Sequence, residues 1–256
     1  EGKFNTVDPA TGNPIQWQDW RPISGENAWA GVIAPLQSYF QKHGNALVAD
    51  STELRLAEEI ARVALLLQAE NGGIRMAPRG TFHPGGMDFL YNLQSVENNL
   101  SWYASFRMLY QMTGDQKYKE AMDKLEGFFQ SAFNRSSGTF VTGKKFSGGQ
   151  WIDDGNFATD VQMWAILVLG VDTVDQWFGE GTALRMLEET KKQSGVFDGP
   201  ALQGFDFTNY RQLGRSAIVS VEWTAFSAFA FEEAANFYSA TRPDAAQSLL
   251  RDAQSM

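Results

Sequence analysis

The stretch SVENNLSWYASFRMLYQMTGDQKYKEAMDKL, residues 95–125, contains two helical patterns that meet at Gly114 and Asp115. The first pattern is apolar on nearly every face, whereas the second is amphipathic and charged on one face. Gly114 stands where a C-cap glycine belongs, and Asp115 is a favourable N-cap for the second helix. The stretch therefore predicts a helical hairpin with one helix in a core and the other helix against water.

This hairpin pattern recurs along the whole chain. A period of 3.6 predicts one series of helices over 26–43, 95–113, 157–178 and 219–240, and a second over 51–70, 115–132, 181–193 and 243–255. Ser51, Thr159 and Ser220 are further N-cap candidates, and Gly44 is a further C-cap candidate. Within each series, the starts of successive helices are separated by a nearly constant length of chain. Such interleaved series predict stacked helical hairpins.

The two series differ in chemistry, and the difference predicts the fold class. The first series is apolar nearly all round, as in DVQMWAILVLGV at 160–171, and the second is amphipathic. An inner ring of apolar helices covered by an outer ring of amphipathic helices is an α/α toroid, an all-α fold. Four hairpins are visible, whereas a closed toroid usually has six. We expect a single domain over residues 1–256, with an extended segment over 1–22, and a truncated ring rather than an open one.

Composition excludes several classes of function. The net charge of −9 repels nucleic acid and polyanionic substrates. There is no cysteine and there are only two histidines, which excludes disulfides, thiolate zinc sites and His-rich metal sites. Nucleotide-binding and zinc-protease motifs are absent, so we expect no metal and no cofactor. The apolar stretches are too short for a membrane span. We expect a secreted or periplasmic protein, with the cytoplasm as the alternative.

The candidate catalytic residues are carboxylates at the start of each inner helix. Inner helices of a toroid run in one direction, so their N-terminal ends gather at one mouth. Each carries a carboxylate with a tryptophan close behind it: Glu26 with Trp29, Glu97 with Trp102, Asp160 with Trp164, and Glu222 with Trp223. Cleavage of a glycosidic bond needs one protonated and one ionised carboxyl group. Flat aromatic faces stack on sugar rings, and Asn98 and Tyr103 are further candidates for contact with the substrate.

Structural explanations compete with this functional interpretation. The helix macrodipole favours an acidic residue in the first turn whether or not the residue has a function. A tryptophan on an inner helix is more often part of the core than a platform for substrate. The offset from carboxylate to tryptophan also differs from one helix to the next, so the pairs do not repeat one dyad.

Two glycine-rich segments are candidates for loops over the mouth. FSGGQWIDDGNFATD, residues 146–160, carries Trp151, Asp153 and Asp154, which we expect to contact substrate there. A polar connector is the alternative, and the spacing of a calcium loop is absent. RGTFHPGGMDFLYN, residues 79–92, carries His83, the only candidate for an imidazole base.

SVENNLSWYASFRMLYQMTGDQKYKEAMDKL, ATDVQMWAILVLG at 158–170 and SVEWTAFSAFAF at 220–231 together resemble the α/α-toroid glycoside hydrolases of the six-hairpin glycosidase superfamily. The resemblance covers roughly residues 22–256. It implies a catalytic carboxylate at the head of an inner helix, among Glu97, Asp160 and Glu222. Asp160 with Glu222 is the favoured pair, because both lie beside a tryptophan on adjacent inner helices.

Three hypotheses for the function remain open. The leading one is a glycosidase that acts on a neutral oligosaccharide or polysaccharide. A lyase or epimerase of uronic sugars is the second, and it needs a base such as Tyr91, Tyr103, Tyr210 or His83. The third is a toroid without catalytic activity that binds a glycan or a protein in the same groove.

Overall fold

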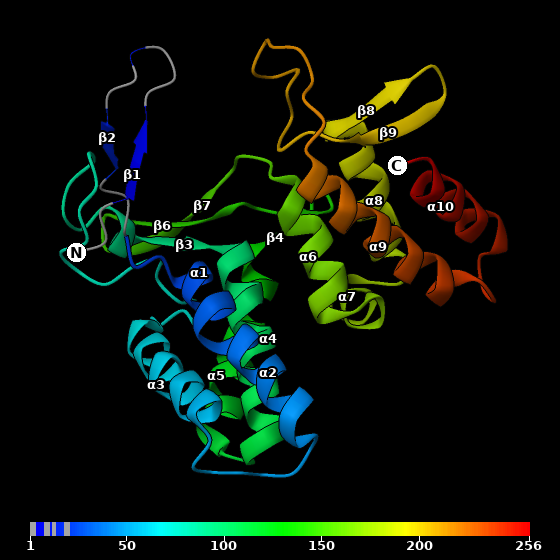
Figure 1. Cartoon of the computed structure of the whole chain (residues 1–256). Helices are drawn as coiled ribbons and strands as arrows, with labels where there is room; N and C mark the ends of the chain where they lie inside the picture. The colour runs from blue at the N-terminus through cyan, green and yellow to red at the C-terminus, as the bar shows by residue number, and fades with distance from the viewer. Residues whose placement is uncertain (1–3, 8–10, 12–13, 18–20) are drawn as a thin grey trace.

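The helices of the chain form two alternating series. The computed structural model describes residues 4–7, 11, 14–17 and 21–256. The inner series comprises α1 (Ser24–Ala28), which continues through the π-helical turn η1 (Trp29–Ile33) into α2 (Ala34–His43), then α4 (Val96–Thr113), α6 (Thr159–Leu169) and α9 (Val221–Tyr238). The outer series comprises α3 (Thr52–Leu67), α5 (Gln116–Ala132), α8 (Thr182–Ser194) and α10 (Pro243–Ser255). Inner helices contact one another in the order α1, α4, α6 and α9 (Figure 1). The α/α-toroid arrangement predicted from the sequence is confirmed.

Most of the predicted helix ends are confirmed by capping contacts. Ser51, Asp115 and Ser220 each accept a backbone N–H from the first turn of α3, α5 and α9. Gly44 and Gly114 end α2 and α4 at positive φ, as the C-cap prediction requires. The prediction for Thr159 is wrong. Ala158 is the N-cap residue of α6, and the Thr159 hydroxyl instead donates to the backbone carbonyl of Asp206.

The third predicted inner helix, 157–178, is two helices. Gly170 lies between α6 and α7 (Val171–Phe178) and has a φ of 94°, a conformation that only glycine adopts without strain. The α6 axis therefore ends at Leu169, and α7 packs against α6, α8 and α9. The two helices differ in character, because α6 is apolar on all sides whereas α7 is amphipathic with Asp172, Asp175 and Gln176, and the prediction overlooked this change at Gly170.

Short strands occupy the long segments between hairpins, and the sequence did not predict them. β3 (Leu93–Ser95), β6 (Gly143–Ser147) and β7 (Gln150–Asp154) form a three-stranded antiparallel sheet in the order β3-β6-β7. β4 (Phe133–Asn134) pairs with β5 (Thr139–Phe140), and β8 (Gly195–Asp198) pairs with β9 (Ala201–Phe205). The one-turn helix η2 (Leu90–Asn92) precedes β3.

The predicted extended segment over residues 1–22 contains one hairpin. β1 (Phe4–Val7) pairs antiparallel with β2 (Pro14–Trp17). Residues 1–3, 8–10, 12–13 and 18–20 of that prediction lie outside the described residues.

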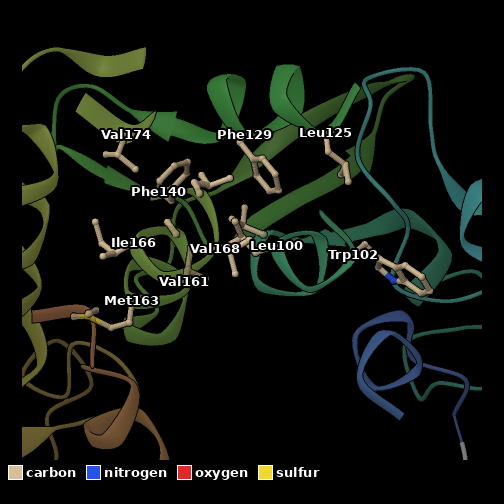
Figure 2. Packing of buried hydrophobic residues seen from close by; sticks show 14 of the residues in the cluster. Leu100, Trp102, Leu125, Phe129, Phe140, Val161, Met163, Ile166, Val168 and Val174 are labelled. Carbon is tan, nitrogen blue, oxygen red and sulfur yellow. The ribbon is translucent and has the colours of Figure 1, made fainter. Parts of the chain in front are cut away.

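The core lies between the inner and outer helices. Phe106 of α4 and Phe128 and Phe129 of α5 are fully buried, and Figure 2 shows Leu100, Phe129 and Ile166 among the side chains packed there. Each fully buried side chain of this size stabilises the fold by about 1.5–3 kcal/mol. In the described part of the chain, no helix combines the length and the apolar character that crossing a lipid bilayer requires.

Candidate functional site

A cleft of about 580 Å³ opens where the N-terminal ends of the inner helices meet. It is lined by Ile23, Gly25, Glu26, Trp29, Glu97, Asn98, Asp160, Trp164, Glu222, Trp223 and Phe226. Each of the inner helices contributes one carboxylate to this lining. None of the lining residues among those described is Lys, Arg or His. The cleft therefore combines concentrated negative charge with aromatic surface.

Glu97 has the most perturbed acidity of these carboxylates. Burial, with the nearby negative charge of Asp160, raises the pKa of Glu97 to about 7, although the Ser101 hydroxyl opposes the rise. Glu222 and Glu26 add further negative charge. Glu97 lies in the first turn of α4, where the helix macrodipole favours its ionised form. Burial and like charge outweigh this effect of the macrodipole. A carboxyl group that is half protonated near neutral pH is suited to donate a proton.

Asp160 is also perturbed, but it has better partners for its ionised form. Burial raises the pKa of Asp160, while the backbone N–H of Val161, at 2.9 Å from Oδ1, opposes the rise. The indole N–H of Trp223 also faces this carboxylate and lowers the pKa, although its geometry falls short of a regular hydrogen bond. Glu97 and Asp160 therefore lie in different environments. Pairs of carboxyl groups that differ in this way serve as acid and base in many enzymes.

An aromatic wall lines one side of the cleft. Trp29 from η1, Trp164 from α6 and Phe226 from α9 form a row, with ring centroids 5.5 Å apart in the first pair and 4.6 Å in the second. The Trp29 N–H donates to the Ser101 hydroxyl over 3.1 Å, and that hydroxyl donates to Glu97 Oε1 over 3.2 Å. Trp29 of the aromatic wall and the Glu97 carboxyl group are therefore joined by hydrogen bonds through Ser101.

Two of the predicted contact residues on α4 lie away from the cleft. Trp102 is 1% exposed, packs on Phe106 and borders a separate apolar cavity of about 100 Å³. Tyr103 faces α5, where its hydroxyl donates to Glu126 and burial raises its pKa to about 12. The reason is helical rotation: five and six positions after Glu97 the helix has turned to other faces. Trp164, four positions after Asp160, stays on the same face.

The residues predicted over the mouth contact other partners. Trp151 on β7 donates its N–H to Glu70, Asp153 pairs with the buried Lys144, and Asp154 accepts from Asn156. His83 stacks on Phe89 and accepts the N–H of Gly85. None of Trp151, Asp153, Asp154 and His83 lines the cleft.

Sequence reasoning missed a set of buried polar residues that hold the inner helices in place. Each lies two positions after a cleft carboxylate: Asn99, Gln162 and Thr224. Asn99 bonds both backbone groups of Ile74, and Gln162 bonds both backbone groups of Phe140 at 2.9 Å. Thr224 accepts the N–H of Phe205. The signal was available, because ENN, DVQ and EWT each place a polar residue inside an apolar helix.

Replacing Gln162 tests this anchoring. Gln162→Leu leaves the N–H and the C=O of the buried Phe140 without partners, and each such group costs about 1–3 kcal/mol. We expect a loss of about 2–4 kcal/mol in the free energy of unfolding, measured by urea denaturation. Gln111→Leu, on the exposed face of α4, is the matched control and is expected to change little. A Gln162→Leu variant as stable as this control would contradict the anchoring role.

The described residues contain no group of three or more His, Cys, Asp or Glu side chains arranged to hold a metal ion.

The α/α-toroid fold of this chain is similar to that of several solved structures. An unsaturated glucuronyl hydrolase from Bacillus sp. GL1 superposes with a TM-score of 0.56 at 15% identity, over 99% of this chain and 77% of that chain. A sugar epimerase from a ruminal bacterium superposes with a TM-score of 0.60 at 14% identity, over 95% of this chain and 60% of that chain. The α-1,6-mannanase of family 76 from Salegentibacter sp. HEL1_6 superposes with a TM-score of 0.55 at 14% identity, over 90% of this chain and 62% of that chain.

These likenesses show the architecture that the sequence predicted. The chain spans about three fifths of the epimerase and of the mannanase, and about three quarters of the glucuronyl hydrolase. Neither a protein-family model nor a curated protein sequence matches it.

Proposed function

We propose that the chain is a glycoside hydrolase that cleaves an oligosaccharide or polysaccharide lacking acidic groups. The observation that carries the proposal is Glu97, a carboxyl group with a pKa of about 7 beside Asp160 in an aromatic cleft. Two carboxyl groups in different protonation states are what glycoside hydrolysis requires. The cleft volume suits a short length of glycan.

The proposed roles follow from the partners of each group. Glu97 donates a proton to the leaving-group oxygen, and its Oε2 carries this proton because Oε1 already accepts the Ser101 hydroxyl. The ionised form of Asp160, which accepts the Val161 N–H, stabilises the developing positive charge at the sugar carbon. It acts there as the nucleophile or as the base for water. The sequence favoured Asp160 with Glu222, and in this proposal Glu222 shapes the charge of the cleft.

The contents of the cleft favour this reaction over elimination from a uronic sugar. A uronate carries a carboxylate, which the ionised carboxylates of the lining repel and no described lining cation offsets. The bases that a lyase needs, Tyr91, Tyr103, Tyr210 or His83, do not line the cleft. Elimination by a lyase is therefore the alternative that the assay for ultraviolet absorbance tests.

The experiment is an assay for new reducing ends on a panel of neutral, basic and uronic polysaccharides, with ultraviolet absorbance recorded in parallel. New ends without absorbance support the hydrolase. New ends with absorbance would mean an eliminating lyase. Binding of a polysaccharide without any product would contradict the proposal and support the binding protein.

Gly25 provides a test of the cleft shape. A Cβ at residue 25 would lie 2.3 Å from Asn98 Oδ1, so Gly25→Ala displaces the Asn98 side chain from the cleft wall. We expect the rate of hydrolysis to fall about tenfold to a hundredfold, because small misplacements in an active site have effects of this size. Stability should change by less than about 1 kcal/mol, since alanine favours the helix.

Gly127→Ala is the control for this substitution. Gly127 is also helical, on α5, and a Cβ there meets nothing within 4 Å. It should leave the rate unchanged. Equal rates in the Gly25→Ala and Gly127→Ala variants would show that the Asn98 wall has no part in the reaction.

A further inference from the structure

The negative charge inside the cleft is not balanced by any positively charged side chain among its described lining residues. Glu26, Glu97, Asp160 and Glu222 come from four different inner helices, and the lining includes no Lys, Arg or His. Carboxylates gathered in this way repel one another, which contributes to the raised pKa of Glu97. A positively charged ligand would relieve that repulsion.

The aromatic residues of the cleft also suit a cation. The rings of Trp29, Trp164 and Phe226 lie in one row, Trp223 also lines the cleft, and Trp29 is 41% exposed. An ammonium group over such a face gains about 0.5–2 kcal/mol, and tryptophan is the best partner. The same faces stack on the apolar side of a sugar ring. A sugar that carries an ammonium group would use both interactions.

Asn98 indicates that the ligand also carries oxygen acceptors. It is 7% exposed and lines the cleft, and its Nδ2 has no hydrogen-bond partner in the described part of the chain. A buried amide N–H without a partner costs about 1–3 kcal/mol, which a ligand oxygen recovers once the covered Asn98 amide rotates toward the cleft. A polyamine or a bare cation offers no acceptor for this donor. A hydroxyl or ring oxygen of a sugar does.

We propose that the glycan accepted by this cleft contains amino sugars with free, protonated amino groups. The inference rests on the proposed hydrolase function and specifies its substrate class. The ammonium group lies among the carboxylates, the apolar face of the ring stacks on the tryptophan row, and a ring or hydroxyl oxygen accepts the Asn98 N–H. N-acetylation removes the positive charge and weakens binding.

The binding experiment compares sugars that differ only at carbon 2. Glucosamine, galactosamine and mannosamine are titrated against the whole chain by calorimetry, beside their N-acetylated and hydroxyl counterparts, in a buffer acidic enough to protonate the amines. We expect at least one amine to bind about tenfold tighter than both of its counterparts, with the difference shrinking as salt is added. Equal or weaker binding of all three amines, or no binding by any sugar, overturns the inference.

Variants test whether the cleft carboxylates are responsible. Glu222→Gln should weaken binding of the amine about fivefold and change binding of the neutral sugar less than twofold. Glu232→Gln removes the same charge from an exposed site on α9 outside the cleft and is expected to change neither. Equal effects of the two variants would mean that the preference reflects only net charge, which overturns the inference.

The hydrolysis panel separates this inference from the proposed function. Faster cleavage of a deacetylated polysaccharide than of its acetylated form supports both. Cleavage of neutral polysaccharides without any preference for free amines overturns the substrate class and leaves the hydrolase. A binding preference for amines with no new reducing ends from any polysaccharide overturns the hydrolase and the claim that the amino sugar is its substrate.

Discussion

Glu97→Gln is expected to lower the rate of glycoside hydrolysis by about 10²–10⁴-fold, the usual contribution of a general acid. Glutamine keeps the hydrogen bond from Ser101 but has no proton to give to the leaving oxygen. The wild-type rate should fall as the pH rises above about 7, because Glu97 then loses its proton. That decline should be absent from the variant. The measurement is kcat against pH for both proteins.

An activated substrate distinguishes proton donation from a structural role. An aryl glycoside with a good leaving group needs little protonation, so the Glu97→Gln variant should cleave it at a rate much closer to wild type. Glu120→Gln, on the exposed face of α5, is the matched control for the charge removed. A loss below tenfold on the natural glycan, or equal losses on both substrates, would contradict the assignment of Glu97 as the acid.

Asp160→Ala is expected to reduce the rate by about 10³-fold or more on the natural and the activated substrates alike, since it removes the charge that stabilises the reacting carbon. Added azide should restore part of the rate, because a small anion fits the space left by the side chain. The configuration of the glycosyl azide then reports whether Asp160 serves as the nucleophile or as the base.

Controls exclude unfolding as the cause of this loss. Removing a carboxylate from among its like charges should not lower the melting temperature. Asp123→Ala, at an exposed ion pair on α5, removes the same group elsewhere and should have no effect on the rate. Asp160→Ala with more than a tenth of the wild-type rate would remove Asp160 from the mechanism.

The fold could be predicted from the sequence to a large degree, because helices carry their own period. The alternation of apolar and amphipathic segments indicated both rings, and the capping residues Ser51, Asp115 and Ser220 marked the starts of their helices. The break at Gly170 was missed, because the change from the apolar α6 to the amphipathic α7 was overlooked. β3 was missed because it pairs with β6 across a whole helical hairpin, so no local pattern marks it.

The candidate site could be predicted only in part. The position of a carboxylate at each inner helix start was enough to find the four that line the cleft. Trp102 and Tyr103 were misplaced because proximity in sequence was used without the rotation of the helix. The acidity of Glu97 depends on burial and on Asp160, which belongs to the next inner helix along the chain. No local pattern contains that information.

The connections at the two ends of the inner helices differ greatly in length. At the mouth of the cleft, the long segments 68–95, 133–158 and 195–220 join α3 to α4, α5 to α6 and α8 to α9. At the other end, the short segments 44–51, 114–115 and 239–242 join α2 to α3, α4 to α5 and α9 to α10. Parts of the long segments belong to the core, because Ile74, Phe140 and Phe205 are buried and bond to Asn99, Gln162 and Thr224 of the inner helices. The exposed turns between these buried residues are the parts that tolerate insertion and exchange. Each long segment therefore has two parts with different tolerance: its exposed turns can change in length, whereas the buried residues that bond an inner helix fix where the carboxylate of that helix stands in the cleft.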